Sequence, residues 1–358
     1  MAYTTIDDPS AHFQSEAFTT PGGASSTTFD GNSDLQPDMI WAKQRNAANG
    51  HELWDSTRGV NSTLFPDITS VEDTAANRIT AFNSDGFSWG NAGNLNTAGN
   101  FVAWAWKANG GTTSSNTDGT ITSTVQANTT AGFSIGTFTG TWTSGDTVGH
   151  GLGVKPDMLI LKSRNNPSGA AMYWVVAHKG IDDMAGLSCM FLDGTNAKLT
   201  SSVYWANTAP TSSVFSVGDN AAVNYVGNNM VFYAFNAVQG FSKFGSYTGN
   251  GRSDIGAFIN TGFRPAFILI KSVSSRAWYL FDNKREGFNS SGTRGNFYLQ
   301  AQDTDAESSN NVVDILSNGF QIVQSSSTQF NGSGEVYIYS AWAENPFVSS
   351  TGIPTTAR

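Results

Sequence analysis

The side chains that could carry catalysis or bind a metal are few and scattered in this sequence. The four histidines, His12, His51, His150 and His178, form no HExxH motif and no other metal-ligand spacing. Acid–base catalysis needs groups within hydrogen-bond reach of each other, and no stretch of the chain gathers such groups. We therefore assign no catalytic residue, no cofactor-binding residue and no metal ligand, and we do not expect an enzyme.

Two pairs of opposite charge recur at matching places in the chain. Asp55 precedes Arg58 by three residues, and Asp282 precedes Arg285 in the same way. Glycoside hydrolysis needs two carboxylates about 5 to 10 Å apart, so carboxylates deserve attention. The recurrence instead favours a structural pair that holds the end of a strand and its loop.

Other acidic residues gather in two short runs. Asp303, Asp305 and Glu307 offer oxygen atoms that could bind Ca²⁺, but the run lacks the glycine and the spacing of an EF-hand loop. We favour a solvated acidic loop there, and the same interpretation applies to Asp182 and Asp183.

The remaining candidates are single residues. Cys189 is the one cysteine, which excludes an internal disulfide, and its apolar neighbours indicate a buried small side chain. His150 lies in a glycine-rich turn, where we favour a packing role. A few aromatic residues near turns could form stacking platforms for a sugar ring: Trp142, Tyr204, Trp205 and Tyr247.

The elements that hold these residues are organised by an internal repeat, because four landmarks occur three times in the same order. The landmarks are a strand ending in lysine (37–43, 156–162, 265–271), a strand ending in a polar residue (53–55, 176–178, 280–282), a turn and strand (85–89, 213–217, 318–322) and a closing strand (102–106, 231–235, 338–342). Their spacing of roughly 105 to 130 residues is typical of whole domains in tandem.

Aligning the landmarks makes two residue-level predictions. Trp106, Phe235 and Trp342 share one slot in the closing strands, so we expect all three to be buried. His178 aligns with Asp55 and Asp282, which indicates that this strand end needs a polar group rather than a histidine.

The composition predicts an all-β protein. Only 13% of the 358 residues are charged, while 38 glycines, 24 phenylalanines, 10 tryptophans and 10 tyrosines favour strands and turns. Apolar runs broken every 8 to 12 residues match three tandem β-sandwich or jelly-roll-like domains. The net charge of -9 leaves no basic stripe for nucleic acid.

The predicted domains are repeat one, repeat two and repeat three with a C-terminal extension, spanning 1–111, 112–239 and 240–358. We expect their segments 12–107, 120–236 and 240–348 to superpose. Residues 108–119 have the composition of a flexible connection, and the tail 349–358 that of a loosely ordered extension. The chain shows no secretory signal and no apolar stretch of membrane length, so we expect a soluble protein.

Several short motifs together carry a resemblance to a known group of proteins. The motifs are residues 2–9, 33–39, 149–157, 208–216, 241–251, 262–265 and 341–347. They resemble a family of repeat-bearing virion proteins of tailed, often marine, bacteriophages, described as tail-fibre-like or as containing a domain of unknown function. The turn 20–23 of repeat one departs from this pattern, so a surface role is least transferable there.

The resemblance implies a virion structural protein with no catalytic residues to carry over. We expect a tail fibre or spike-type appendage that contacts the host surface. The alternatives are a capsid or tail decoration protein and a polysaccharide-binding or depolymerising protein. The implied partners are other virion proteins, further copies of the chain as a homotrimer, and host-surface glycan or protein, with no cofactor, no nucleic acid and no membrane insertion. The implied location is the virion, assembled in the host cytoplasm.

Overall fold

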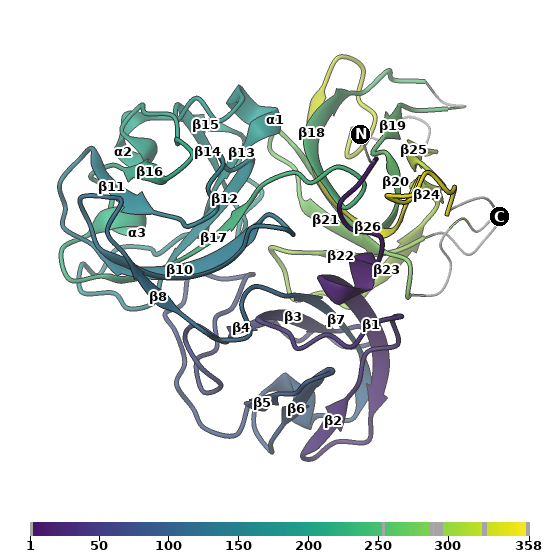
Figure 1. Ribbon diagram of the computed structural model, residues 1–358, viewed down its shortest axis with the longest axis horizontal. Coiled ribbons are helices and arrows are strands. Elements are labelled where there is room, and N and C mark those ends of the chain that lie inside the picture. The colour runs from purple at the N-terminus through teal and green to yellow at the C-terminus, as the bar shows by residue number, and fades with distance from the viewer. Residues whose placement is uncertain (1–2, 253–254, 286–288, 290–295, 324–327, 356–358) are drawn as a thin grey trace.

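The computed structural model describes residues 3–252, 255–285, 289, 296–323 and 328–355. Nearly all its regular elements are antiparallel strands, so the all-β prediction is confirmed. Figure 1 shows three lobes around a common centre, each formed by one repeat. The described α-helices have four residues each, and no helix in these ranges is long and apolar enough to cross a membrane.

Repeat one has a four-stranded sheet in the order β1-β7-β3-β4 and a small sheet in the order β2-β6-β5. Its elements are η1 (Pro9–Ala11), β1 (Phe13–Thr20), β2 (Ser25–Thr27), β3 (Met39–Gln44), β4 (Glu52–Asp55), β5 (Ile79–Phe82), β6 (Phe87–Trp89), η2 (Asn94–Asn96) and β7 (Gly99–Trp106).

Repeat two enlarges this plan to an eight-stranded sheet, β15-β14-β13-β12-β17-β10-β9-β8, with a small sheet β11-β16. Its elements are β8 (Ser114–Asn116), β9 (Ser123–Asn128), β10 (Phe133–Thr139), β11 (Asp146–Gly149), β12 (Met158–Ser163), β13 (Val175–His178), α1 (Lys179–Asp182), β14 (Ser188–Phe191), β15 (Leu199–Thr200), α2 (Ser202–Trp205), β16 (Val214–Val217), α3 (Ala221–Asn224) and β17 (Asn229–Phe235).

Repeat three has a six-stranded sheet, β18-β26-β20-β21-β22-β23, and a small sheet β19-β25-β24. Its elements are β18 (Ser242–Thr248), β19 (Phe258–Asn260), β20 (Phe263–Ser272), β21 (Trp278–Asp282), β22 (Asn296–Gln300), β23 (Ser308–Asn310), β24 (Val313–Leu316), β25 (Gly319–Ile322) and β26 (Val336–Pro346).

The large sheets share one strand order in all three repeats. The order β1-β7-β3-β4 of repeat one recurs as β10-β17-β12-β13 and as β18-β26-β20-β21. The closing strands β7, β17 and β26 are therefore internal strands, each between the lysine-ended strand and β1, β10 or β18. Segments 12–107, 120–236 and 240–348 thus share this four-strand order, which is what their expected superposition requires.

In each large sheet the lysine-ended strand and the closing strand are buried on both faces, which explains why these strands are nearly continuously apolar. In β7, Trp104 and Trp106 point to a core shared by all three repeats, whereas Ala103 and Ala105 point to a core inside repeat one. Repeats two and three have corresponding inner cores between their large and small sheets. The molecule thus has three large sheets, each with a small sheet beside it, around one common core.

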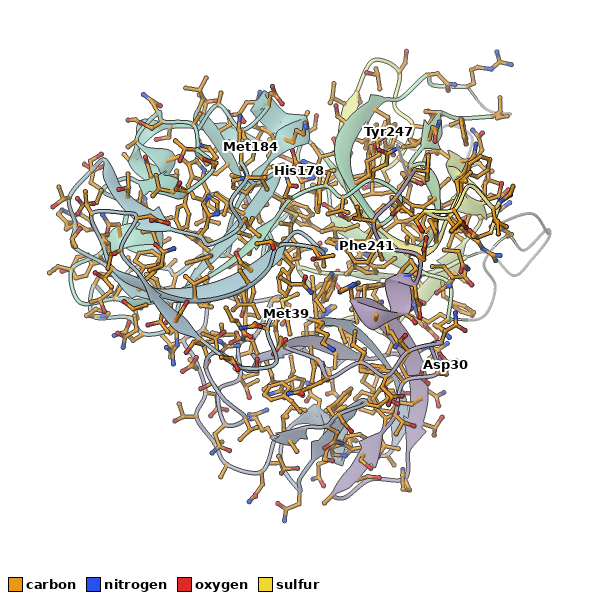
Figure 2. All side chains as sticks on the ribbon, in the orientation of Figure 1. Asp30, Met39, His178, Met184, Phe241 and Tyr247 are labelled. Carbon is orange, nitrogen blue, oxygen red and sulfur yellow. The ribbon has the colours of Figure 1, made fainter. Side chains whose placement is uncertain are left out.

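The closing-strand aromatics meet in this common core, where Figure 2 also shows Met39, His178 and Phe241. Trp106, Phe235 and Trp342 are 2 to 3% exposed, so their predicted burial is confirmed. Their ring centroids lie 6.4 Å apart for Trp106 and Phe235, 5.3 Å for Trp106 and Trp342, and 5.4 Å for Phe235 and Trp342. Equivalent residues of the three repeats therefore contact one another directly.

Two segments predicted to be loose are held in place. Between repeats one and two, the buried carboxylate of Asp38 accepts hydrogen bonds from the backbone N–H groups of Ala108, Gly110 and Gly111 at 2.7 to 2.9 Å, and β8 joins the sheet of repeat two. In the tail, the backbone N–H of Ser350 donates to the Asp7 carboxylate at 2.6 Å. Composition missed both because their partners lie elsewhere in the chain; residues 356–358 lie outside the described part.

Candidate functional site: the contacts between the repeats

The polar residues that end the second strand of each repeat face the common core. Asp55 pairs with Met39, His178 with Met158 and Asp282 with Phe267 across their strand ladders. Side chains directly opposite in an antiparallel pair lie on the same face of the sheet, and all three partners belong to the common core. Asp55, His178 and Asp282 are 0 to 4% exposed. Their alignment from sequence is confirmed.

Each of these residues is bound by the neighbouring repeat. The contacts are Tyr233 Oη donating to Asp55 Oδ2 (2.6 Å), Trp104 Nε1 donating to Asp282 Oδ2 (3.1 Å) and His178 Nε2 lying 3.2 Å from Ser340 Oγ. Trp104, Tyr233 and Ser340 each lie two residues before the central aromatic of their closing strand. We call these six residues the strand-end ring. Its contacts run in one direction, from repeat two to one, one to three, and three to two, as in a closed cyclic trimer.

The recurring Asp/Arg pairs support this ring. Arg58 Nε lies 2.5 Å from Asp55 Oδ2, and Arg285 Nε lies 2.7 Å from Asp282 Oδ2, with all four side chains at most 1% exposed. Each aspartate also accepts the backbone N–H of its arginine at 2.9 Å. The structural interpretation of the pairs is therefore confirmed, because each holds a strand end and its turn.

Repeat two departs from the pair. Its strand end carries His178, whose Nδ1 accepts the backbone N–H of Gly180 at 2.9 Å. Burial lowers the pKa of His178 to about 3, so the imidazole is neutral at physiological pH. A neutral ring with one donor and one acceptor thus replaces a carboxylate and its arginine.

A second set of contacts follows the same cyclic order. The residue four positions before each strand end donates to a backbone carbonyl of its neighbour: Trp174 Nε1 to Phe65 O (2.8 Å), Trp278 Nε1 to Phe191 O (2.7 Å) and His51 Nε2 to Gln300 O (3.0 Å). In His51 the other ring nitrogen accepts from Trp41 Nε1 at 2.8 Å. Since an indole N–H can only donate, His51 Nε2 must carry the proton.

A third set lies nearer the surface. The backbone N–H of Glu72 donates to Arg164 O, that of Lys198 to Val273 O, and that of Glu307 to Arg45 O, at 2.7 to 2.9 Å. These contacts again join repeats one to two, two to three, and three to one. Glu307 Oε2 also pairs with Arg45 Nε at 2.9 Å, so this end of the predicted solvated acidic loop belongs to an interface instead. The loop was misjudged because Arg45 is remote in sequence.

The lysines that end the first landmark are buried and bonded to backbone carbonyls. Lys43 Nζ donates to Gln44 O at 2.6 Å, and Lys271 Nζ donates to Ser272 O at 2.8 Å. Burial lowers the pKa to about 8 for Lys43 and Lys162 and to about 7 for Lys271. These amines hold the loop that follows each strand.

The isolated candidates have packing roles. His150 is fully buried, with Nδ1 accepting the backbone N–H of Leu152 and Nε2 lying 3.2 Å from Thr211 O. Cys189 is also fully buried, and burial raises the pKa of its thiol to about 12. Asp182 accepts backbone N–H groups of its own turn, including that of Ser188 at 2.9 Å. Within the described residues, no group of three or more His, Cys, Asp or Glu side chains could hold a metal ion.

The proposed stacking aromatics differ sharply in exposure. Tyr204, Trp205 and Tyr247 are only 2 to 8% exposed, so they cannot offer a ring face to a ligand. Trp142 is 43% exposed. Of these four residues, Trp142 alone stays a candidate platform.

A polar cleft of about 340 Å³ lies between repeats one and three. Its walls include Gln14, Asp30, Asn283 and Lys284, and the Lys284 ammonium pairs with the Asp30 carboxylate across the two repeats. Beside Asp30, burial and the neighbouring negative charge raise the pKa of Glu16 to about 7. The cleft can hold a small polar ligand, although Lys284 and Asp30 already pair across the interface and Arg264 pairs with Glu344 within repeat three.

The sequence alignment identified the polar slot at the strand ends, but it did not predict any contact between repeats. The sequence did contain a signal for these contacts. Hydrogen-bonding or aromatic residues recur two positions before the closing aromatic and four positions before the strand end in every repeat. The landmark that supplies Phe65, Phe191 and Gln300 was missed because its three versions share little sequence.

The fold and its contacts define a class: an all-β protein whose three repeats contact one another in a closed cycle. A model of the family described as "Domain of unknown function (DUF7483)" matches residues 8–346, so the chain belongs to that family. The match runs through all three repeats, so the family model covers the three repeats together. No curated protein and no solved structure matches the chain.

Proposed function

We propose that the protein is a bacteriophage virion structural protein that acts as a tail fibre or spike-type appendage. The observation that carries the proposal is that the polar residues recurring at the strand ends bind neighbouring repeats. Asp55, His178 and Asp282 bind neighbouring repeats, and the arginines beside two of them secure the same contacts. A chain that uses its recurring polar residues to assemble its own sandwiches has the design of a scaffold. The resemblance to virion proteins supports the same function.

A capsid or tail decoration protein is the second candidate, and the three-fold arrangement of the repeats favours it. Figure 1 shows a compact body with three similar lobes rather than an elongated one. Such a body presents related surfaces in three directions, which suits attachment at a three-fold position of a particle.

The proposed partners are other virion proteins, further copies of the chain and a host-surface glycan or protein. Self-association as a homotrimer is proposed by analogy with fibres. The proposed location is the virion, after assembly in the host cytoplasm.

Mass spectrometry of particles purified through two density gradients and a high-salt wash tests this function. We expect peptides of the chain at a constant ratio to the major capsid protein, with an abundant host cytoplasmic protein as the control for adhering material. Electron microscopy with a labelled antibody then separates an appendage from a capsid decoration. Absence from the particles would refute the proposal, and release of reducing sugar from host polysaccharide would favour a depolymerase.

A further inference from the structure

Trp142 has an unusual backbone conformation for a large side chain. It lies in the turn between β10 and β11 with φ of 67°, in the left-handed region that favours glycine. Its indole is 43% exposed. The cost of this conformation is therefore not offset by burial in the core of the protein.

The other two repeats use glycine in the corresponding turn. In repeat three the position belongs to Gly251, with φ of 66°, and the turn of repeat one contains Gly22 and Gly23 with φ of 89° and 83°. The backbone N–H groups of Trp142 and Gly251 make matching hydrogen bonds, to Asn224 O at 2.7 Å and to Asn331 O at 2.9 Å. The fold therefore requires a left-handed residue here, and repeat two alone fills the position with an aromatic residue.

The turn that carries Trp142 is held firmly. Asn224 at the end of α3 is fully buried, and its Oδ1 accepts the backbone N–H of Thr141 at 2.9 Å. Its Nδ2 donates to Thr143 O at 3.0 Å. One buried amide thus binds both sides of Trp142, so the indole is presented in a fixed position. β11 and α3 lie on the side of repeat two away from the other repeats (Figure 1).

The surroundings of the indole combine a second aromatic ring with uncharged polar groups. Tyr225 meets Trp142 edge to face, with centroids 4.9 Å apart and an interplanar angle of 77°. Val226 beside it is 58% exposed. Thr143 and Ser144 expose their side chains on the same turn.

This chemistry matches a sugar ring better than a protein surface. The C–H face of a pyranose stacks on an indole, and hydroxyl groups beside the ring can exchange hydrogen bonds with sugar hydroxyls. A stable protein interface needs about 800 Å² and some 20 to 30 residues on each side. Trp142, with Tyr225 and Val226 from the segment after α3, forms a much smaller platform, of the size of one or two sugar units.

We propose that the Trp142 turn is a carbohydrate-binding site in which the indole stacks on a pyranose ring of a bacterial surface polysaccharide. The bacterial source of the glycan rests on the proposed function. The inference deepens that function by assigning host-glycan contact to one turn of repeat two. Ligand binding by the indole gives a physical reason why repeat two has a strained, exposed tryptophan where the other repeats have glycine.

An array of bacterial surface polysaccharides probed with the purified full chain tests the site. We expect binding to at least one polysaccharide and a change in tryptophan fluorescence when its oligosaccharide is titrated. Trp142→Gly restores the residue type of the other repeats, so it should fold normally and weaken binding at least tenfold. Trp142→Phe should retain part of the affinity, because a smaller ring still stacks.

Tyr173→Ala is the matched control, since Tyr173 is 39% exposed in repeat two on a different segment. This variant should bind like the unchanged chain. Absence of binding to any polysaccharide, or equal binding by Trp142→Gly, would overturn the proposal, as would binding only to a host protein. Glycan binding by a chain that is absent from particles would refute the virion function alone.

Discussion

Equivalent positions of the three repeats carry similar residues at the centre of the molecule and different residues in the outer turns. At the centre, Trp106, Phe235 and Trp342 are all large aromatics and contact one another. At the outer turn, the same comparison gives glycine in repeats one and three and Trp142 in repeat two. The difference follows from what each position contacts. A central residue must fit two other repeats, whereas the turn is fastened only to its own repeat and can diverge.

The largest effect is expected from removing a central ring. Trp342→Ala should lower the free energy of unfolding by about 3 to 5 kcal/mol, because it leaves a cavity between three repeats. Urea denaturation followed by circular dichroism measures the change. Phe258→Ala, at a position 47% exposed, is the control and should cost less than about 1 kcal/mol. An unchanged unfolding midpoint for Trp342→Ala would show that the common core contributes little.

Replacing one residue of the strand-end ring at a time tests whether its contacts stabilise each repeat equally. Asp282→Ala leaves the buried Arg285 without its closest carboxylate and should cost about 3 kcal/mol. His178→Ala removes a neutral group and should cost about 1 to 2 kcal/mol. Chemical denaturation of both variants makes the comparison. Equal costs would mean that the ion pair adds nothing beyond hydrogen bonding.

A tryptophan placed in the turn of repeat one measures the cost of the Trp142 conformation. Gly23 has φ of 83°, and a Cβ added there meets no atom within 4 Å, so Gly23→Trp introduces backbone strain without a clash. The expected loss of stability is about 1 to 2 kcal/mol. Gly23→Asn should lose less, because asparagine tolerates this conformation. If Gly23→Trp were neutral, the strain argument for Trp142 would fail.

The smallest effect concerns Glu16 beside the cleft. Burial raises its pKa in the folded protein to about 7, so stability falls as the pH rises from the ordinary glutamate range through 7. Glu16→Gln removes this penalty and should raise the melting temperature by roughly 1 to 3 °C at pH 8. At pH 4, where the carboxyl is mostly protonated whether folded or unfolded, the variant should melt close to the unchanged chain. A gain of the same size at both pH values would contradict the shifted pKa.

The sequence was sufficient for features that depend on local periodicity and on comparing the repeats. The strand-end slot, the Asp55–Arg58 pair and the burial of Trp342 could all be predicted, because each repeat supplied a check on the others. Apolar periodicity also gave the all-β class, since it reports which faces of a strand avoid water.

The partners that these residues contact in the other repeats could not be predicted, for a physical reason. Periodicity shows that both faces of β7 are buried but not which element covers the second face. Here Trp104 reaches Asp282, a residue 178 positions away. The loop-like composition of 108–119 was misleading for the same reason, because its ordering comes from the distant carboxylate of Asp38.

The three repeats belong to one chain, and this has a genetic consequence. In a trimer of identical subunits, a codon change alters three places at once, including every copy of a turn. Here a codon change in an outer turn alters one repeat, and the contacts between the repeats at the centre are left in place. Repeat two could therefore acquire Trp142 while Gly23 and Gly251 were kept. A single gene can in this way evolve one specialised face on a body whose other faces stay unchanged.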